Sequence, residues 1–256
     1  MDYLTLYKNL LLKEVFRIKE VYPYTKGNKQ VASNIIQRLL KKRLIRRIRH
    51  GFYYTVPLEL SGRDFQPNPY LIAAKLAKKY FLSHYTALEL HGMAQTAIHA
   101  SYISVVSPRA GFAFKGHRYI FVKNNKSFGI ITKKINDTPI FYTDIERTFL
   151  ECLKTLKYSV SLEVFLKSFD NAKLNFNKME KYLTLLGSKA LYSKAGYVFS
   201  LLKNTLDVPK GFLTKLRKKV SKKTYYLESK AKGANKKNKE WNLMVPKNIE
   251  ELMKVA

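Results

Sequence analysis

Apolar residues recur at helical spacing between Asn28 and about Arg43. Asn28 is a suitable N-cap, because its side chain can accept a hydrogen bond from the free amides of a first helical turn. The positions three and four residues apart predict one buried face, which consists of Val31, Ala32, Ile35, Ile36, Leu39 and Leu40. The pattern therefore predicts an amphipathic helix with a polar stripe on its other side.

Shorter patterns flank this helix. Apolar-rich segments predict helices over Tyr3–Leu12 and Glu14–Val21. Leu44–Arg49 and Phe52–Val56 are typical of two short strands, joined by a His50–Gly51 turn in which glycine can adopt a positive φ. A helix followed by a basic hairpin is the order of the recognition helix and the wing in a winged helix-turn-helix, which we assign to residues 1–57.

Prolines, a glycine and polar residues then predict a linker over residues 58–69. The remaining residues, 70–256, alternate between helical and strand-like patterns. Helices are expected at Pro69–Tyr80, Phe81–Gly92, Ile145–Lys157, Leu162–Phe169, Lys178–Leu186, Leu191–Asn204 and Leu213–Val220. Strands are expected at Tyr102–Ser107, Tyr119–Lys123, Gly129–Ile135, Ile140–Tyr142 and Trp241–Val245, with a polar loop at Gly233–Lys239. Central strands with flanking helices indicate an α+β domain.

The charge of the chain indicates its class of partner. A net charge of +30, from 48 basic and 18 acidic residues, favours a polyanion, either nucleic acid or an anionic membrane. A lysine-rich composition would give the same total, but five of the eleven arginines lie between Arg38 and Arg49. From Val21 to Leu58 there are nine basic residues and no acidic one, whereas a solvated helix normally carries both signs. This favours a surface facing phosphates over an ordinary basic face.

The expected DNA contacts lie on the polar stripe and the hairpin. Side chains that can reach base edges are Gln30, Ser33, Asn34, Gln37 and Arg38. Cations expected on phosphates are Lys29, Lys41 and Lys42, and the wing adds Arg46, Arg47, Arg49 and His50 at a minor groove or at adjacent phosphates. Further phosphate contacts are expected from Arg217, Lys218, Lys219, Lys222 and Lys223.

The sequence gives little support for a metal site, a reactive cysteine or a cofactor-binding motif. The spacing of His50, His84, His91, His99 and His117 does not pair two of them on one helix face, which favours structural histidines over a metal site. Cys152, the single cysteine, lies in an apolar helical segment and is expected to be a buried thiol. Thr143–Glu146 fits a capping box that starts a helix. No phosphate-binding loop, dinucleotide fingerprint or nucleophile elbow is present. We therefore expect no enzyme activity, no catalytic residue, no metal and no cofactor.

No apolar run approaches the length of a membrane span, and the N-terminal segment lacks the core of a signal peptide. We expect a cytoplasmic protein that does not bind a membrane.

Five segments, in order along the chain, resemble the AbiEi family of antitoxins, the regulator partners of AbiEii-type nucleotidyltransferase toxins. They read LIRRIRHGFYYT, PYLIAAKLAKKYFLSHYTALELHGM, YTDIERTFLECL, YSKAGYVFSLL and NKKNKEWNLMVP. The resemblance implies a repressor that binds inverted repeats of double-stranded DNA in its own operon. It also implies a C-terminal domain that neutralises a toxin without binding it directly.

Two other functions stay open at this point. The basic helix and the many tyrosines would also suit an RNA-binding protein. The Glu228-Ser229-Lys230 triplet, with Asp207 earlier in the chain, is weakly similar to a metal-dependent nuclease, although metal chemistry needs carboxylates that converge.

Overall fold

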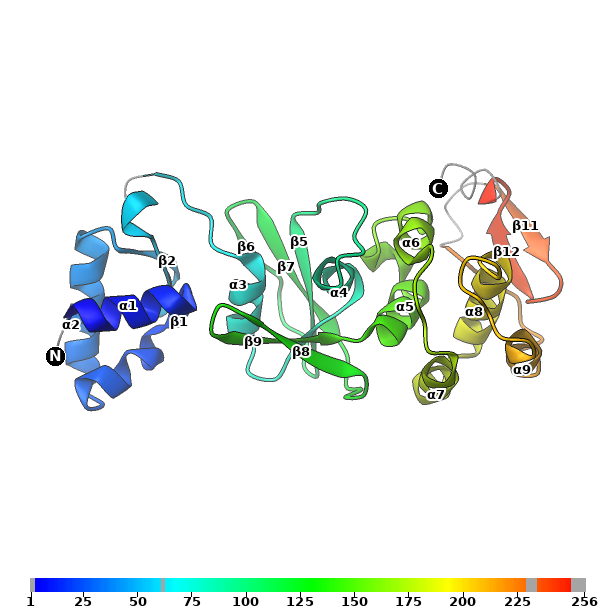
Figure 1. Ribbon diagram of the computed structural model, residues 1–256, viewed down its shortest axis with the longest axis horizontal. Coiled ribbons are helices and arrows are strands. Elements are labelled where there is room, and N and C mark those ends of the chain that lie inside the picture. Colours follow the sequence, from blue (N-terminus) through cyan, green and yellow to red (C-terminus); the bar gives the residue numbers. More distant parts are fainter. Residues whose placement is uncertain (1–2, 61–62, 229–233, 250–256) are drawn as a thin grey trace. The chain divides into compact units, whose positions relative to one another are not determined.

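The computed structural model describes residues 3–60, 63–228 and 234–249, and these form a mixed α+β protein, as expected (Figure 1). Contacts divide the chain into two compact units. The first holds residues 1–82, 99–126 and 131–141, and the second holds residues 83–98, 127–130 and 142–256. The first unit thus combines residues 1–57 with later segments of the chain. The expected domain boundaries therefore stay a prediction.

The N-terminal part of the first unit is a small helix-and-sheet assembly. Its elements in order are α1 (Tyr3–Lys13), β1 (Val15–Arg17), two 3₁₀ turns (Ile18–Glu20 and Tyr22–Thr25), α2 (Lys29–Lys41), β2 (Ile45–Arg49) and β3 (Phe52–Thr55). The three strands pair antiparallel in the order β1-β3-β2. One buried cluster contains Leu6 and Leu10 of α1, Ile35 and Ile36 of α2, and Tyr53 of β3. Both helices therefore pack on one face of this sheet.

The helix expected over Glu14–Val21 is wrong. Glu14 adopts a left-handed φ of 59° that ends α1, and Val15–Arg17 then pair with β3 as a strand. Val31 and Leu40 were expected in the buried face of α2, but Val31 is 43% exposed and Leu40 is half-buried. At about 100° per residue, both lie about a quarter turn from the centre of the buried stripe formed by Ala32, Ile35, Ile36 and Leu39.

A six-stranded sheet follows in the order β6-β7-β5-β4-β9-β8. Its strands are β4 (Phe81–Leu82), β5 (Ala100–Val105), β6 (Phe112–Phe114), β7 (His117–Lys123), β8 (Ile130–Ile135) and β9 (Thr138–Thr143), and β5 and β7 run parallel. Helix α3 (Pro69–Leu76) packs on β5 and starts at Asn68, whose side chain accepts from the amide of Tyr70. The helix was expected to reach Tyr80, but it ends at Leu76 because Ala77 is extended.

The second unit is mainly helical. Its elements are α4 (His84–Leu90), α5 (Ile145–Lys154), a 3₁₀ turn (Leu156–Tyr158), α6 (Leu162–Phe169), α7 (Phe176–Leu186), α8 (Lys189–Leu201), α9 (Phe212–Arg217), β10 (Tyr225–Tyr226), β11 (Asn235–Asn238) and β12 (Leu243–Pro246). The rings of Phe149, Phe165, Phe169 and Phe199 stack and cross at centroid distances of 4.8–5.2 Å in the core. Helix α6 has the expected bounds.

The expectations for residues 81–92 and 233–239 are wrong. Phe81 and Leu82 pair with β5 as a strand, so the expected helix Phe81–Gly92 begins only at His84. The polar segment expected as a loop contains β11, which pairs antiparallel with β12 through Asn235–Asn238; Gly233 lies outside the described residues. Backbone pairing needs no apolar side chain, and so a polar sequence can form this strand.

Candidate nucleic-acid interface

Helix α2 presents a polar face to solvent. Asn28 caps it as expected, with its Oδ1 accepting from the amide of Val31 at 3.0 Å. The exposed residues on this helix and at its C-terminal end are Lys29, Gln30, Val31, Asn34, Gln37, Arg38, Lys41 and Lys42, and Ser33 is half-buried. Gln30 Nε2 donates to Asn34 Oδ1 at 3.2 Å, so two amide side chains lie side by side one turn apart.

The C-terminal end of α2 carries a concentrated positive charge. Arg43 adopts a φ of 58°, and the amide of Leu44 donates to the carbonyl oxygen of Leu39 at 3.0 Å, which closes the helix in a Schellman motif. This left-handed residue is usually glycine, and here it is an exposed arginine. Lys41, Lys42 and Arg43 are therefore consecutive exposed cations at the negative end of the helix dipole.

A β-bulge separates the arginines of the hairpin. Arg47 pairs with Tyr53 and Arg49 pairs with Phe52, so that Ile48 is an extra residue in β2. Tyr53 and Phe52 are neighbours in β3 and point to opposite faces of the sheet. On the face of the sheet that packs against α2, the guanidinium carbon of Arg47 lies 5.9 Å from the centre of the Tyr53 ring. On the opposite face, the guanidinium carbon of Arg49 lies 6.0 Å from the centre of the Phe52 ring.

The arginines on the far face contact other parts of the chain. Arg49 lies 5.2 Å from the ring centre of Phe112, and Arg46 donates to the carbonyl oxygen of Arg63 at 2.7 Å. Arg46 is also 3.7 Å from a carboxylate oxygen of Asp64. Both side chains would have to leave these partners before they could contact a nucleic acid.

Within the described residues, no ion pair involves Lys29, Lys41, Lys42 or Arg47. The charges of these four residues are therefore available to an external anion. His50 and Gly51 form the turn at the tip of the hairpin, as expected, and His50 is exposed. Whether any of these residues contacts DNA stays a prediction.

The expected C-terminal phosphate contacts lie at and after α9, in the second unit. Their exposed side chains belong to Arg217, Lys218, Lys219, Lys222 and Lys223. Arg217 is 3.3 Å from a carboxylate oxygen of Glu240, and the Lys223 ammonium lies 5.9 Å from the ring centre of Tyr225. The ion pair reduces the charge that Arg217 offers to a phosphate, while no ion pair among the described residues involves Lys218, Lys219 or Lys222.

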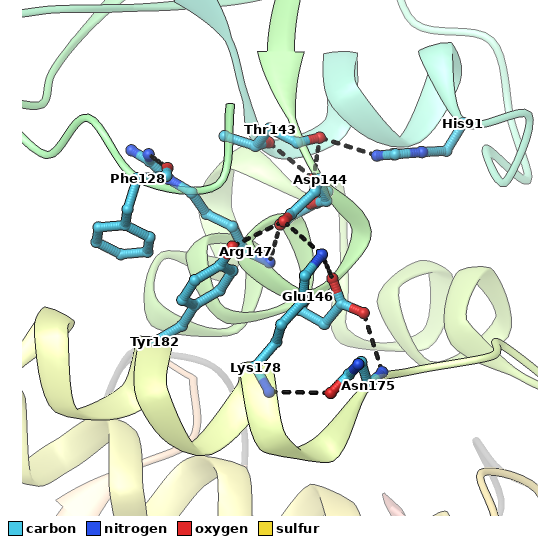
Figure 2. Close-up of polar contacts among 10 residues, drawn as sticks. His91, Phe128, Thr143, Asp144, Glu146, Arg147, Asn175, Lys178 and Tyr182 are labelled. Carbon is cyan, nitrogen blue, oxygen red and sulfur yellow. Dashed lines mark hydrogen bonds and ion pairs between the residues drawn. The ribbon is translucent and has the colours of Figure 1, made fainter. Parts of the chain in front are cut away.

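A second polar cluster lies between α5 and α7 (Figure 2). Asp144 caps α5, accepting from the amide of Arg147 at 3.0 Å. Its other carboxylate oxygen accepts from the hydroxyl of Tyr182 at 2.9 Å and from the ammonium of Lys178 at 3.2 Å. Burial and the neighbouring Asp144 raise the pKa of Tyr182 to about 12, so its hydroxyl remains a donor at neutral pH.

Arg147 is fully buried at the centre of this cluster. Its Nε donates to Glu151 at 2.8 Å, one guanidinium nitrogen donates to the carbonyl oxygen of Phe128, and its guanidinium carbon lies 4.6 Å from the Phe128 ring centre. A buried charge is costly unless it is paired and hydrogen-bonded, and these contacts meet that condition. The cluster joins α5, α7 and residues 127–130, and we interpret it as a structural clamp. A helix starts here as expected, but the expected capping box is wrong: the N-cap is Asp144 rather than Thr143, and Glu146 accepts from the amide of Asn175 at 2.9 Å instead.

Three of the five histidines make structural contacts. His91 hydrogen-bonds the carbonyl oxygen of Thr143 at 2.8 Å, His84 the hydroxyl of Ser83 at 2.9 Å, and His117 the hydroxyl of Ser101 at 2.9 Å. Over residues 3–60, 63–228 and 234–249, no three His, Cys, Asp or Glu side chains gather where they could hold a metal. Ser229 and Lys230 of the nuclease-like triplet lie outside these ranges.

Cys152 is buried and free, as expected, and burial raises the pKa of its thiol. Within the part of the chain that the structure describes, none of the helices has the length and apolar character needed to cross a bilayer.

Two features of the interface were missed from the sequence. Val31 is an exposed apolar side chain on an otherwise polar face, and its place in the helical repeat, off the centre of the stripe, could have revealed it. The bulge at Ile48 has no signal in the sequence, because it depends on the register between β2 and β3.

Comparison with known proteins shows the fold alone. No family model matches the chain, and no curated protein matches it. The structure is similar to the crystal structure of the RV2827C protein from Mycobacterium tuberculosis, with a TM-score of 0.65 over 94% of this chain and 89% of that chain. The two sequences are 13% identical. The shared fold extends over nearly the whole of both proteins.

Proposed function

We propose that this protein is a DNA-binding transcriptional repressor and antitoxin of a toxin–antitoxin operon, with α2 as its recognition helix and the β2–β3 hairpin as its wing. The observation that carries the proposal is the exposed face of α2, which offers cations, amides and a hydroxyl, in a stretch from Val21 to Leu58 with no acidic residue. Phosphates on both sides of a groove would repel any carboxylate there, which explains the absence of acid.

The dimensions of α2 suit a major groove. Thirteen residues span about 20 Å, and the groove admits one α-helix. In this proposal Ser33, Asn34, Gln37 and Arg38 approach base edges, and Lys29, Lys41 and Lys42 contact phosphates on either side. The exposed methyl groups of Val31 add a surface that fits the methyl group of thymine.

The wing contributes mainly through Arg47 and His50. Arg47 lies on the α2 face of the hairpin and is in no ion pair within the described residues, whereas Arg46 and Arg49 contact other parts of the chain. The role of the wing in binding a minor groove or adjacent phosphates therefore depends first on Arg47.

The repressor and antitoxin roles rest on the resemblance to the AbiEi family. Under this reading the chain binds inverted repeats upstream of its own gene. Its larger C-terminal part counters a nucleotidyltransferase-type toxin without binding it directly.

A competition experiment tests the nucleic-acid class. Fluorescence anisotropy at one salt concentration would compare the duplex upstream of the gene, a scrambled duplex of equal length and a structured RNA. The proposal predicts that the upstream duplex binds most tightly, by at least about a thousandfold over the scrambled one. Tighter binding of the RNA would contradict it and favour an RNA-binding protein. Cleavage of labelled duplex in Mg²⁺ or Mn²⁺ would favour a nuclease.

A further inference from the structure

A basic groove in the first unit lies apart from α2. Six cations line it, and they come from three segments of the chain. Arg17 and Lys19 belong to β1 and the turn after it, and Arg109 lies in the loop after β5. Lys75 is in the last turn of α3, and Lys78 and Lys79 follow that helix. Its volume is about 790 Å³, and its described lining includes Ser107 and several apolar residues but no carboxylate. Cations from separate segments thus converge on one hollow.

The groove lies on the side of the N-terminal sheet that faces away from α2. Arg17 pairs with Phe52, while Phe16 pairs with Tyr53, whose ring packs in the same buried cluster as α2. Neighbouring residues of a strand point to opposite faces, so Arg17 points away from that helix. A ligand in the groove would therefore be distinct from a duplex bound along α2.

Two guanidinium groups are held in place at the groove by the C-terminal end of α3. Arg17 Nε donates to the carbonyl oxygen of Lys75 at 2.9 Å, and Arg109 Nη1 donates to that of Leu76 at 3.3 Å. Arg109 also stacks on Phe121, with 5.2 Å between the guanidinium carbon and the ring centre. A guanidinium has five N–H donors in a fixed fork, so these contacts orient the remaining donors without using them all.

The charge in the groove is only partly balanced. Glu20 binds Lys75 at 2.7 Å and Lys13 at 3.4 Å. Lys19, Lys78 and Lys79 are exposed and take part in no ion pair within the described residues. Burial lowers the pKa of Arg17, and the nearby positive charges of Arg49 and Arg109 lower it further.

We propose that this groove binds a compact oligophosphate group, either free or as the di- or triphosphate of a nucleotide. The six cations converge from three segments of the chain, so together they can contact several negative charges on one small molecule. The volume lies within the range of about 300–1,000 Å³ typical of small-molecule sites. The described lining has no aromatic ring, so the groove lacks the stacking platform with which single-stranded nucleic acids are bound.

Isothermal titration calorimetry on the full chain tests this inference, with sodium tripolyphosphate, ATP and a short single-stranded DNA as separate ligands. The test variant is Lys78→Ala/Lys79→Ala. The matched control is Lys203→Ala/Lys210→Ala, which removes the same charge from exposed residues of the second unit. Arg109→Ala provides a second test variant.

The inference predicts one site for tripolyphosphate and for ATP, with affinity at least about tenfold weaker in Lys78→Ala/Lys79→Ala and in Arg109→Ala but nearly unchanged in the control. Binding of the upstream duplex should be nearly unchanged in Lys78→Ala/Lys79→Ala, which separates this site from the DNA surface. Equal losses in the test and control variants would overturn the inference, because the net charge would then explain binding. Binding of the DNA strand but not of tripolyphosphate would also overturn it.

Discussion

Arg47 and Arg49 are two residues apart in β2 but lie on opposite faces of the hairpin, Arg47 beside Tyr53 and Arg49 beside Phe52. In a regular strand the two side chains would share a face. The extra residue Ile48 separates them, so that Arg47 remains on the side of α2 while Arg49 lies against Phe112.

This separation predicts different effects of two single substitutions. Arg47→Ala should weaken duplex binding and flatten the dependence of log Kd on log salt by about 0.9, the value for one lost phosphate contact. Arg49→Ala should leave that slope unchanged and lower stability by roughly 0.5–1 kcal/mol, through loss of its ring contacts. Anisotropy titrations over a salt series, with urea unfolding of each variant, measure both quantities. Equal slopes of log Kd against log salt for the two variants would contradict the assignment of the β2–β3 hairpin as a DNA-binding wing.

The cap of α2 makes a prediction about stability. Asn28→Ala should lower the free energy of unfolding by about 1 kcal/mol, because the amide of Val31 loses its acceptor. Asn28→Ser is the control, since serine can replace the cap, and it should remain within a few tenths of a kcal/mol of the parent. Equal losses in both variants, measured by urea unfolding, would show that the cap does not stabilise the helix.

A close approach in the second unit predicts a larger effect. Gly196 of α8 lies directly against Trp241, and a Cβ added there would overlap its ring. Gly196→Ala should therefore cost about 1–3 kcal/mol or more, because a packed core resists added volume. The emission of Trp241, the single tryptophan, should shift in the same variant.

Ser193→Ala on the same helix is the control for Gly196. The buried Ser193 hydroxyl has no hydrogen-bond partner among the described residues, so its removal should cost little. A Gly196→Ala variant as stable as Ser193→Ala would contradict the packing described for Trp241.

The buried histidines predict a dependence of stability on pH. Burial lowers the pKa of both His84 and His117 from 6.5 to about 4. Between these values the unfolded chain binds protons that the folded chain does not, so stability should fall as the pH drops from about 6.5 to about 4. The loss is on the order of 3 kcal/mol for a fully buried histidine.

His84→Gln should reduce this loss, whatever its stability at pH 7, and His117→Gln offers a second variant if the first does not fold. The measurement is urea unfolding at half-unit steps of pH from 7 to 4. A slope as steep as that of the parent in both variants would contradict the neutral, buried state of these histidines.

The sequence was informative where structure is local. The cap at Asn28, the helix after it and the hairpin around His50–Gly51 each depend on residues close in the chain. Strand β1 could not be predicted in this way, because its three residues are extended only through pairing with β3, some forty residues later. The sequence also did not reveal the strand Asn235–Asn238, whose polar residues carry no alternating pattern.

In the candidate site, too, only the features that depend on local sequence could be predicted. The exposed face of α2 follows from helical periodicity, with Val31 as the one exposed residue that had been expected inside. The separation of Arg47 from Arg49 depends on strand register, and the engagement of Arg46 depends on Arg63 and Asp64. The basic groove brings together residues 17–19, 74–79 and 105–109, which no local pattern connects.

The most direct test of the central claim removes the side chains of α2 that are proposed to read bases and leaves the fold of the helix intact. Asn34→Ala/Gln37→Ala/Arg38→Ala would be compared with Asn177→Ala/Lys181→Ala/Thr184→Ala, which removes one charge and two polar groups from the exposed face of α7. For the upstream duplex, we predict an affinity lower by about a hundredfold or more in the first variant, with little change in the second. If the folded first variant bound that duplex as tightly as the second, α2 would not be the recognition helix.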